Sequence, residues 1–393
     1  MVLRGCDKGH DYREEYHDRL TELFSARYAF SFCAGRAALY MLLKAMGIRE
    51  GDEVIVQGFT CSVVPKSIIY LGAKPIYADI NADDYGLTLE SVRKRVSEKT
   101  RVVVIQHSFG IPCHAMEDII AFCKGRGIFT IEDCAHTLGI PYKDKLLGTF
   151  ADAAFFSTDH TKYISTSVGG FAITNDEKIG RTLQNLYQDI PELTQKEQKG
   201  IKFQFVSMNI MRNKRVLFLL RHRVLHIIED IAWRFFDKYC YYMTDYRSTN
   251  FPSYTFPAKL SNLQCMIGLS QIKRLSENIH RRHDLAEKYK NLLDKRYLLP
   301  KDISAPLRFP ILYDNLKTKK LEEVMRGLFA IENWFSPALE CIREDDFDRF
   351  YYNPSECPVA QYVAAHIVNL PVHLKISDKE VEEICRRMNC LLE

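Results

Sequence analysis

The chain has 393 residues, of which 47% are hydrophobic, enough to bury a large core in two or more domains or subdomains. The formal net charge is only +4, so the charge balance gives no reason to expect a nucleic-acid partner. The twelve cysteines form no CxxC pair and no zinc-type spacing with histidine, and we find no signal peptide. We therefore expect free thiols in a reducing cytoplasm and no metal site.

The first part of the chain predicts an N-terminal helix followed by strand–helix units. Residues 11–30 carry apolar positions at helical spacing. A short strand, Gly35 and a helix from about Arg36 follow, and the backbone N–H groups of such a helix N-terminus can bind an anion. Residues 51–80 predict a strand, a helix and a second strand, because β-branched runs alternate with helical spacing.

Residues 101–136 predict two further strands joined by a helix. RVVVIQH is typical of a buried parallel strand that ends at His107, and GIFTIEDCAH of one that ends at Asp133. In an open α/β sheet, ligands bind at the C-terminal ends of parallel strands. We therefore expect both side chains at the ligand-binding edge of a mostly parallel sheet flanked by helices.

The next strand, AAFFS, ends in a polar loop that carries Lys162. An acid at one strand end and a lysine on the loop after the next strand are what pyridoxal phosphate chemistry requires. The lysine bonds covalently to the cofactor aldehyde, and the acid keeps the pyridine nitrogen protonated. Asp133 and Lys162 are the predicted catalytic residues, although each taken singly would more often be an ordinary strand-end acid or surface lysine.

An insert rich in basic and aromatic residues occupies about 195–247. Its second half has one apolar stripe at helical spacing, formed by Leu217, Leu220, Val224, Ile227, Ile228, Ile231 and Phe235. The longest charge-free apolar run, Val216–Leu220, is far short of the ~20 residues of a spanning helix. We favour a helical pair that packs on protein. The alternative is an amphipathic helix at about 212–238 that touches an anionic membrane surface.

Residues 254–293 contain the motif SNLQ and lead into a long helix, after which helices and short strands alternate. With the Gly35, Asp133 and Lys162 segments, this motif makes the chain resemble the DegT/DnrJ/StrS sugar aminotransferases, which have the aspartate aminotransferase fold. The resemblance runs from about Glu14 to the end, apart from the insert. It implies a large pyridoxal phosphate-binding domain at 1–250. A long connecting helix and a small C-terminal α/β domain would occupy 251–393.

The resemblance also implies how the cofactor phosphate is held. Ser157 would bind it together with Gly35 and the adjacent backbone. Arg36 stands where the family usually has threonine, and its guanidinium either reaches the phosphate or points to solvent. Lys259 is a weak candidate for the contact that family members make to the phosphate of a neighbouring subunit.

On the ring side of the cofactor, the resemblance places His136 beside the ring hydroxyl. Cys61 stands where the family has a stacking aromatic, so Phe59 or His107 is expected to cover the ring instead, although Phe59 is at least as readily a core residue. His160 and Trp334 are weaker candidates for contact with substrate.

The resemblance implies transfer of an amino group from an amino acid, with glutamate the expected donor. The acceptor would be a nucleotide-linked keto-sugar used for amino-sugar or surface-glycan synthesis. It also implies a homodimer with shared active sites, in the cytoplasm or at its membrane face. Three alternatives remain: a sugar dehydratase, against which Lys162 argues; a non-catalytic binding module, which would need loss of Lys162 or Asp133; and a pyridoxal enzyme restricted to amino acids.

Overall fold

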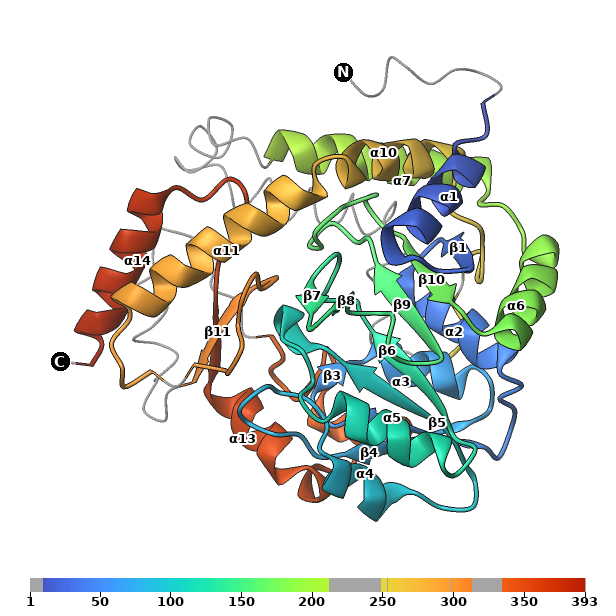
Figure 1. Ribbon diagram of the computed structural model, residues 1–393, viewed down its shortest axis with the longest axis horizontal. Coiled ribbons are helices and arrows are strands. Elements are labelled where there is room, and N and C mark those ends of the chain that lie inside the picture. The colour runs from blue at the N-terminus through green and yellow to red at the C-terminus, as the bar shows by residue number, and fades with distance from the viewer. Residues whose placement is uncertain (1–9, 212–248, 253, 298, 313–333, 393) are drawn as a thin grey trace.

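The computed structural model describes residues 10–211, 249–252, 254–297, 299–312 and 334–392 (Figure 1). The second half of the insert lies outside these ranges, and so does the segment at 212–238 for which membrane contact was considered. Within the described ranges, no helix combines the length and the apolar character needed to cross a membrane.

A seven-stranded sheet forms the centre of the fold, with the order β1-β10-β9-β6-β5-β2-β4. Its members are β1 (Tyr28–Phe32), β2 (Glu53–Gln57), β4 (Lys74–Ala78), β5 (Thr100–Gln106), β6 (Phe129–Asp133), β9 (Ala153–Ser157) and β10 (Gly170–Thr174). The strands from β9 to β4 pair in parallel, whereas β10 is antiparallel to both β9 and β1. The predicted mostly parallel α/β sheet is confirmed.

Both faces of this sheet are covered by helices, which is why strands such as β2 and β5 are nearly continuous β-branched runs. Along β5, Val102 and Val104 enter one hydrophobic cluster, while Val103 and Ile105 enter the other. The first cluster includes buried residues of α2 (Gly35–Ala45), α3 (Val63–Ile69) and α6 (Glu177–Asp189). The second includes residues of α1 (Tyr12–Phe24), α4 (Leu89–Arg95) and α5 (Met116–Lys124).

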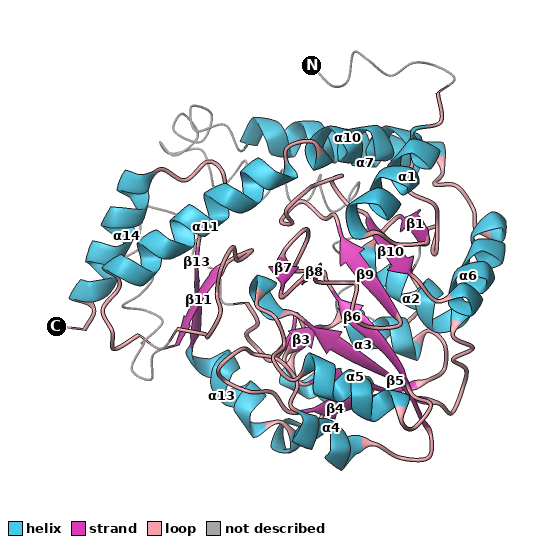
Figure 2. Ribbon diagram, in the orientation of Figure 1, coloured by secondary structure: helices cyan, strands magenta, loops and turns pink. Residues whose placement is uncertain are grey.

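The C-terminal part begins with two consecutive helices, α10 (Asn262–Ile272) and α11 (Leu275–Leu292). Figure 2 shows α11 running away from the large sheet towards α14 (Asp378–Cys390), and the two helices are joined by the ion pair of Arg281 with Asp378. Beside them, β11 (Phe309–Leu312) and β13 (Ile367–Leu370) form an antiparallel pair. The other α-helices in the described part of the chain are α7 (Gln195–Met211) and α13 (Pro358–His366). The domain division at residue 250 stays a prediction.

One short strand of the C-terminal part pairs with a short strand of the N-terminal part. The strand β12 (Leu339–Glu340) pairs in parallel with β3 (Thr60–Cys61), and the Thr60 N–H donates to the Ala338 carbonyl at 2.9 Å. A hairpin of β7 (Pro141–Tyr142) and β8 (Lys145–Leu146) lies between β6 and β9 in the chain. The β12 pairing matters for function because it fixes a late segment of the sequence at the C-terminal edge of the sheet.

Candidate active site

A cavity of about 360 Å³ lies at the C-terminal edge of the parallel strands. Nine of the residues singled out from the sequence line it: Gly35, Arg36, Cys61, Asp133, His136, Ser157, His160, Lys162 and Trp334. They come from the start of α2, from β3, from the ends of β6 and β9, and from the segment before β12. The topology brings them together because β6 and β9 are parallel neighbours whose C-terminal ends meet at one edge.

Asp133 is the last residue of β6 and is 3% exposed. Its carboxylate accepts a hydrogen bond from the Ala135 N–H at 2.9 Å. Burial raises the pKa of Asp133 to about 6, while the Ala135 N–H, Lys162 and His107 act in the opposite direction. A cationic group placed beside this carboxylate would stabilise its charged form.

The loop that carries Lys162 is held in place by α10 and α11. The Gln264 amide nitrogen donates to the carbonyls of Thr166 and Val168 at 3.1 and 2.6 Å. The Asn278 amide nitrogen donates to the Tyr163 carbonyl at 2.6 Å. Gln264 is the last residue of the SNLQ motif and also completes a capping box with Ser261. The two sequence segments with the strongest family resemblance thus act on one another through hydrogen bonds.

The Lys162 amine lies in a mixed electrostatic environment. Burial lowers its pKa, and this effect exceeds the opposite influence of Asp159, Cys61, Glu340 and Asp133. Asp159 forms an ion pair with His160. Burial acts to raise the pKa of Asp159. The hydrogen bond from His160 and the charges nearby nevertheless hold this pKa below its ordinary value. A lysine with a lowered pKa has more of the neutral, nucleophilic amine at a given pH.

An anion cradle forms where α2 starts. Ala34, the N-cap residue of α2, supplies no side-chain hydrogen bond to the first turn, so the N-terminus of this helix is available to an anion in the cavity. Gly170 lets Gly35 and Ser157 approach, because a Cβ atom at Gly170 would lie 2.5 Å from the Gly35 Cα and the Phe156 carbonyl. The Arg36 guanidinium lines the same cavity, with its central carbon 5.6 Å from the Tyr254 ring centroid.

Two aromatic rings that line the cavity, those of His136 and Trp334, stack with a centroid separation of 5.3 Å and an interplanar angle of 5°. The Lys162 Nζ lies 5.0 Å from the Trp334 ring centroid. The Phe109 N–H donates to Nδ1 of His136 at 3.2 Å, which leaves the proton on Nε2. Burial lowers the pKa of His136 well below its ordinary value, and the positive charges of Lys162 and Arg308 lower it further. The ring is therefore neutral.

The structure corrects the expectation that His107 or Phe59 covers the cofactor ring. Both side chains are fully buried and neither lines the cavity. Phe59 packs against other aromatic rings, including that of Phe335 at a centroid separation of 5.1 Å. Besides His136, the aromatic side chains that line the cavity in the described part of the chain are Phe155, Trp334 and Phe335. Lys259 also lies outside this cavity, where its Nζ donates to the Gln188 carbonyl at 3.3 Å.

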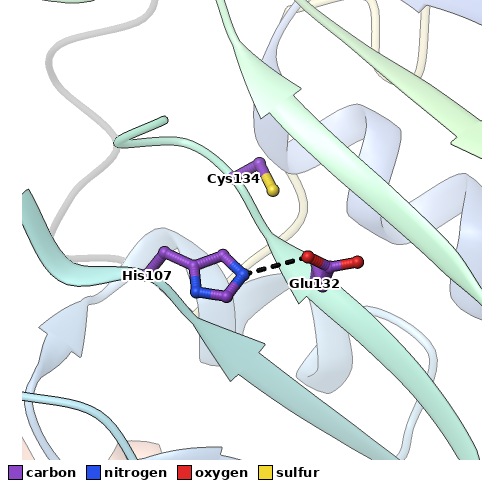
Figure 3. Close-up of side chains that lie close together, drawn as sticks. All are labelled: His107, Glu132 and Cys134. Carbon is purple, nitrogen blue, oxygen red and sulfur yellow. Dashed lines mark hydrogen bonds and ion pairs between the residues drawn. The ribbon is translucent and has the colours of Figure 1, made fainter. Parts of the chain in front are cut away.

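His107 takes part in a buried cluster with Glu132 and Cys134, whose potential ligand atoms lie within 4.8 Å of one another (Figure 3). Hydrogen bonds account for it. The Cys113 N–H donates to Nδ1 of His107 at 3.1 Å, so Nε2 carries the proton and donates to Glu132 at 3.1 Å. Glu132 also accepts three backbone N–H groups at 2.7 to 3.0 Å, from Gly148, Phe150 and Ala151. We therefore interpret the cluster as a structural anchor for the end of β6.

We expect Glu132→Gln to destabilise the protein by about 2–4 kcal/mol, because an amide NH₂ would face a backbone N–H donor wherever it points. Urea unfolding of the variant should show a lower midpoint than the wild type. The exposed carboxylate of Glu98 provides a matched control, and Glu98→Gln should leave the midpoint unchanged. Equal midpoints for the two variants would contradict the anchoring role.

Among the cavity residues that were not identified from the sequence are Asp159, Gln204 and Glu340. Asp159 lies three residues before Lys162, and that proximity was an available signal. Gln204 belongs to α7 inside the insert, and Glu340 reaches the cavity through the β12–β3 pairing. No local pattern marks either of these two residues.

The residues present fit pyridoxal phosphate. A buried carboxylate at one end of the cavity suits the pyridine nitrogen, and a lysine with a lowered pKa suits the aldehyde. The cradle of Gly35, Ser157 and the α2 N-terminus suits a phosphate dianion. The Nε2–H of His136 would donate to the ring oxygen.

Comparison with known proteins agrees with this reading of the site. The model of the DegT/DnrJ/EryC1/StrS aminotransferase family matches residues 6–208 and 234–389. The chain is 29% identical over 395 residues to the spore coat polysaccharide biosynthesis protein SpsC of Bacillus subtilis, covering 94% of this chain and 87% of that protein. It is 36% identical over 169 residues to GDP-perosamine synthase of Escherichia coli O157:H7, over 43% of this chain and 46% of the relative.

Solved structures share the fold at lower identity. The Helicobacter pylori aminotransferase PseC, involved in the biosynthesis of pseudoaminic acid, superposes with a TM-score of 0.74 at 19% identity, covering 98% of this chain and 94% of that one. A GDP-4-keto-6-deoxy-D-mannose-3-dehydratase from E. coli, solved with hydrated pyridoxal phosphate, has a TM-score of 0.74 at 17% identity, covering 98% and 94%. These similarities establish the fold of the chain.

The fold and the site therefore define a pyridoxal phosphate-dependent aminotransferase. More particularly, the chain belongs to the DegT/DnrJ/EryC1/StrS aminotransferase family.

Proposed function

We propose that this protein transfers an amino group from glutamate to a nucleotide-linked keto-sugar, with Lys162 and Asp133 as its catalytic residues. The observation that supports this most strongly is that Lys162, Asp133 and the uncapped N-terminus of α2 share one cavity. When bound, pyridoxal phosphate supplies an electron sink that stabilises negative charge at the substrate carbon.

The residues of the chain would transfer the proton and hold the cofactor in place. Lys162, once released by the incoming amino acid, would take the proton from the substrate carbon and return it one atom further along, as general base and then general acid. Asp133 would keep the pyridine nitrogen protonated. Gly35, Ser157 and the start of α2 would hold the phosphate, and His136 would orient the ring.

The dehydratase remains the second candidate because a dehydratase shares the fold. The presence of Lys162 in the cavity favours transamination, since this lysine can shuttle the proton that amino transfer needs. We also propose a homodimer in which each active site is completed by the partner. Family resemblance supports this arrangement.

The proposed function is tested by following the two half-reactions separately. Addition of glutamate should bleach the visible absorption of the protein-bound cofactor, and a keto-sugar acceptor should restore it. Two acceptors are taken from the names of relatives: UDP-N-acetyl-3-dehydro-alpha-D-glucosamine and 2-deoxy-scyllo-inosose. Restoration by the nucleotide-linked acceptor is the expected result. If glutamate bleaches the band and no keto-sugar restores it, the proposed acceptor class is wrong.

A further inference from the structure

One acidic side chain of the active-site cavity has no role in the reaction as proposed above. Glu340 is the last residue of β12 and is the register partner of Cys61 in β3. This backbone pairing, with Leu339 opposite Thr60, fixes Glu340 at the edge of the cavity that contains Lys162. The position is therefore built into the fold, since two strands far apart in the sequence have to pair to create it.

The charge of Glu340 reaches the reacting groups. It is among the groups that raise the pKa of Lys162, although burial lowers that pKa overall. Burial raises the pKa of the Cys61 thiol well above its ordinary value, and the Glu340 carboxylate adds to this effect. The thiol is therefore protonated and hydrogen-bonds with the carboxylate of Glu340. A carboxylate that acts on Lys162 in this way also acts on a substrate bound at Lys162.

Glu340 also forms part of the wall of two cavities. It lines the cavity of about 360 Å³ that contains Lys162 and a second cavity of about 710 Å³, and Cys341 is the other residue common to both. The second cavity is bordered by Ser336, Arg343 and Gln361. Consider a molecule whose reacting carbon lies at Lys162 and which is too large for the first cavity. If it extended towards the second cavity, it would lie beside Glu340, which lines both.

We propose that Glu340 determines acceptor specificity by accepting hydrogen bonds from the hydroxyl groups of a polyhydroxylated acceptor. This inference rests on the proposed function. A carboxylate can only accept hydrogen bonds, so the hydroxyl groups of a sugar suit it. The predicted acceptor is a neutral sugar ring at the reacting end, with its remaining part directed towards the second cavity.

The test compares two acceptors in the wild type and in Glu340→Gln, which keeps the size of the side chain and removes its charge. The measured quantity is the ratio of kcat/KM for UDP-N-acetyl-3-dehydro-alpha-D-glucosamine to kcat/KM for pyruvate, a small anionic ketone. Loss of a charge-assisted hydrogen bond should lower this ratio by about 10- to 100-fold. Glu98→Gln is the matched control, because Glu98 is exposed and lines neither cavity. This control should keep the wild-type ratio.

A second readout does not depend on turnover. Calorimetric titration with UDP-N-acetylglucosamine, which has the sugar hydroxyls but no ketone, should give a higher Kd for Glu340→Gln than for the wild type or for Glu98→Gln. Damage to the fold would lower kcat/KM for both acceptors together and leave their ratio unchanged, and that result would overturn the inference. If the wild type fails with every keto-sugar while glutamate still bleaches the cofactor band, the proposed function itself is overturned.

Discussion

Lys162→Ala is expected to abolish the visible absorption band of the lysine-bound cofactor and to lower the rate of transamination by at least about 10³-fold. Two losses combine in this variant. The covalent link to the cofactor aldehyde disappears, and so does the amine that shuttles the proton, a role that by itself contributes about 10²- to 10⁴-fold. The measurements are the absorption spectrum after incubation with pyridoxal phosphate and the bleaching rate with glutamate.

The control for Lys162→Ala is Lys145→Ala, which removes an exposed lysine on the β7–β8 hairpin and should behave as the wild type. A small primary amine added to Lys162→Ala should recover part of the glutamate reaction, because it can carry the proton that the lysine no longer carries. A variant that keeps both the band and the rate would show that another lysine is the attachment site.

Asp133→Asn is expected to have two opposite effects, a loss of activity and a gain in stability of the cofactor-free protein. Without the carboxylate, the pyridine nitrogen is no longer held protonated, and we expect the rate with glutamate to fall by at least about 10²-fold. The asparagine is nearly isosteric and its side-chain oxygen can still accept the Ala135 N–H. The loss should therefore be electronic, with cofactor binding weakened and the covalent link through Lys162 retained.

The gain in stability follows from the buried charge. Burial raises the pKa of Asp133 from the ordinary value of 3.8 to about 6, so the folded protein binds this proton more tightly than the unfolded chain does. Stability contributed by this group is present below pH 4 and is lost as the pH rises to about 6. At pH 7 the shift of about two units corresponds to a cost of about 3 kcal/mol, which Asp133→Asn removes.

Urea unfolding of the cofactor-free wild type and variant at pH 7 and at pH 4 measures this effect. The variant should be the more stable protein at pH 7, and the difference should shrink as the pH falls from 6 to 4. Asp118→Asn, which changes an exposed carboxylate on α5, should show no such pH-dependent difference. A wild type that gains stability between pH 4 and 6 relative to Asp133→Asn would contradict the raised pKa.

Local sequence patterns predicted the parts of the site that lie next to regular elements. The continuous β-branched run before Asp133 indicated a strand buried on both faces, and β6 is such a strand. The glycine before a helical pattern indicated the start of a helix, and α2 begins at Gly35. These predictions of strand and helix succeed because the period of each element and its ends are encoded within a few consecutive residues.

Residue types alone could not predict the role of the His107 side chain. His107 directly follows the parallel strand β5, and Asp133 is the last residue of β6, yet the His107 ring hydrogen-bonds with the buried Glu132 and does not line the cavity. Which way a side chain at a strand end turns depends on the partners that other segments supply. Here the backbone N–H groups of Cys113 and Gly148 complete the arrangement, and both come from separate loops.

The sequence by itself determined the α/β class and the mostly parallel sheet, and it predicted Asp133 and Lys162 as the catalytic pair. Each of these depends on local periodicity or on residue type at a strand end. Only the tertiary structure decided that Trp334 stacks on His136 and that Glu340 stands beside Cys61. Both residues lie about two hundred residues or more from their partners in the chain. Long-range contacts of this kind depend on how β12 docks onto β3, and no short-range pattern encodes that docking.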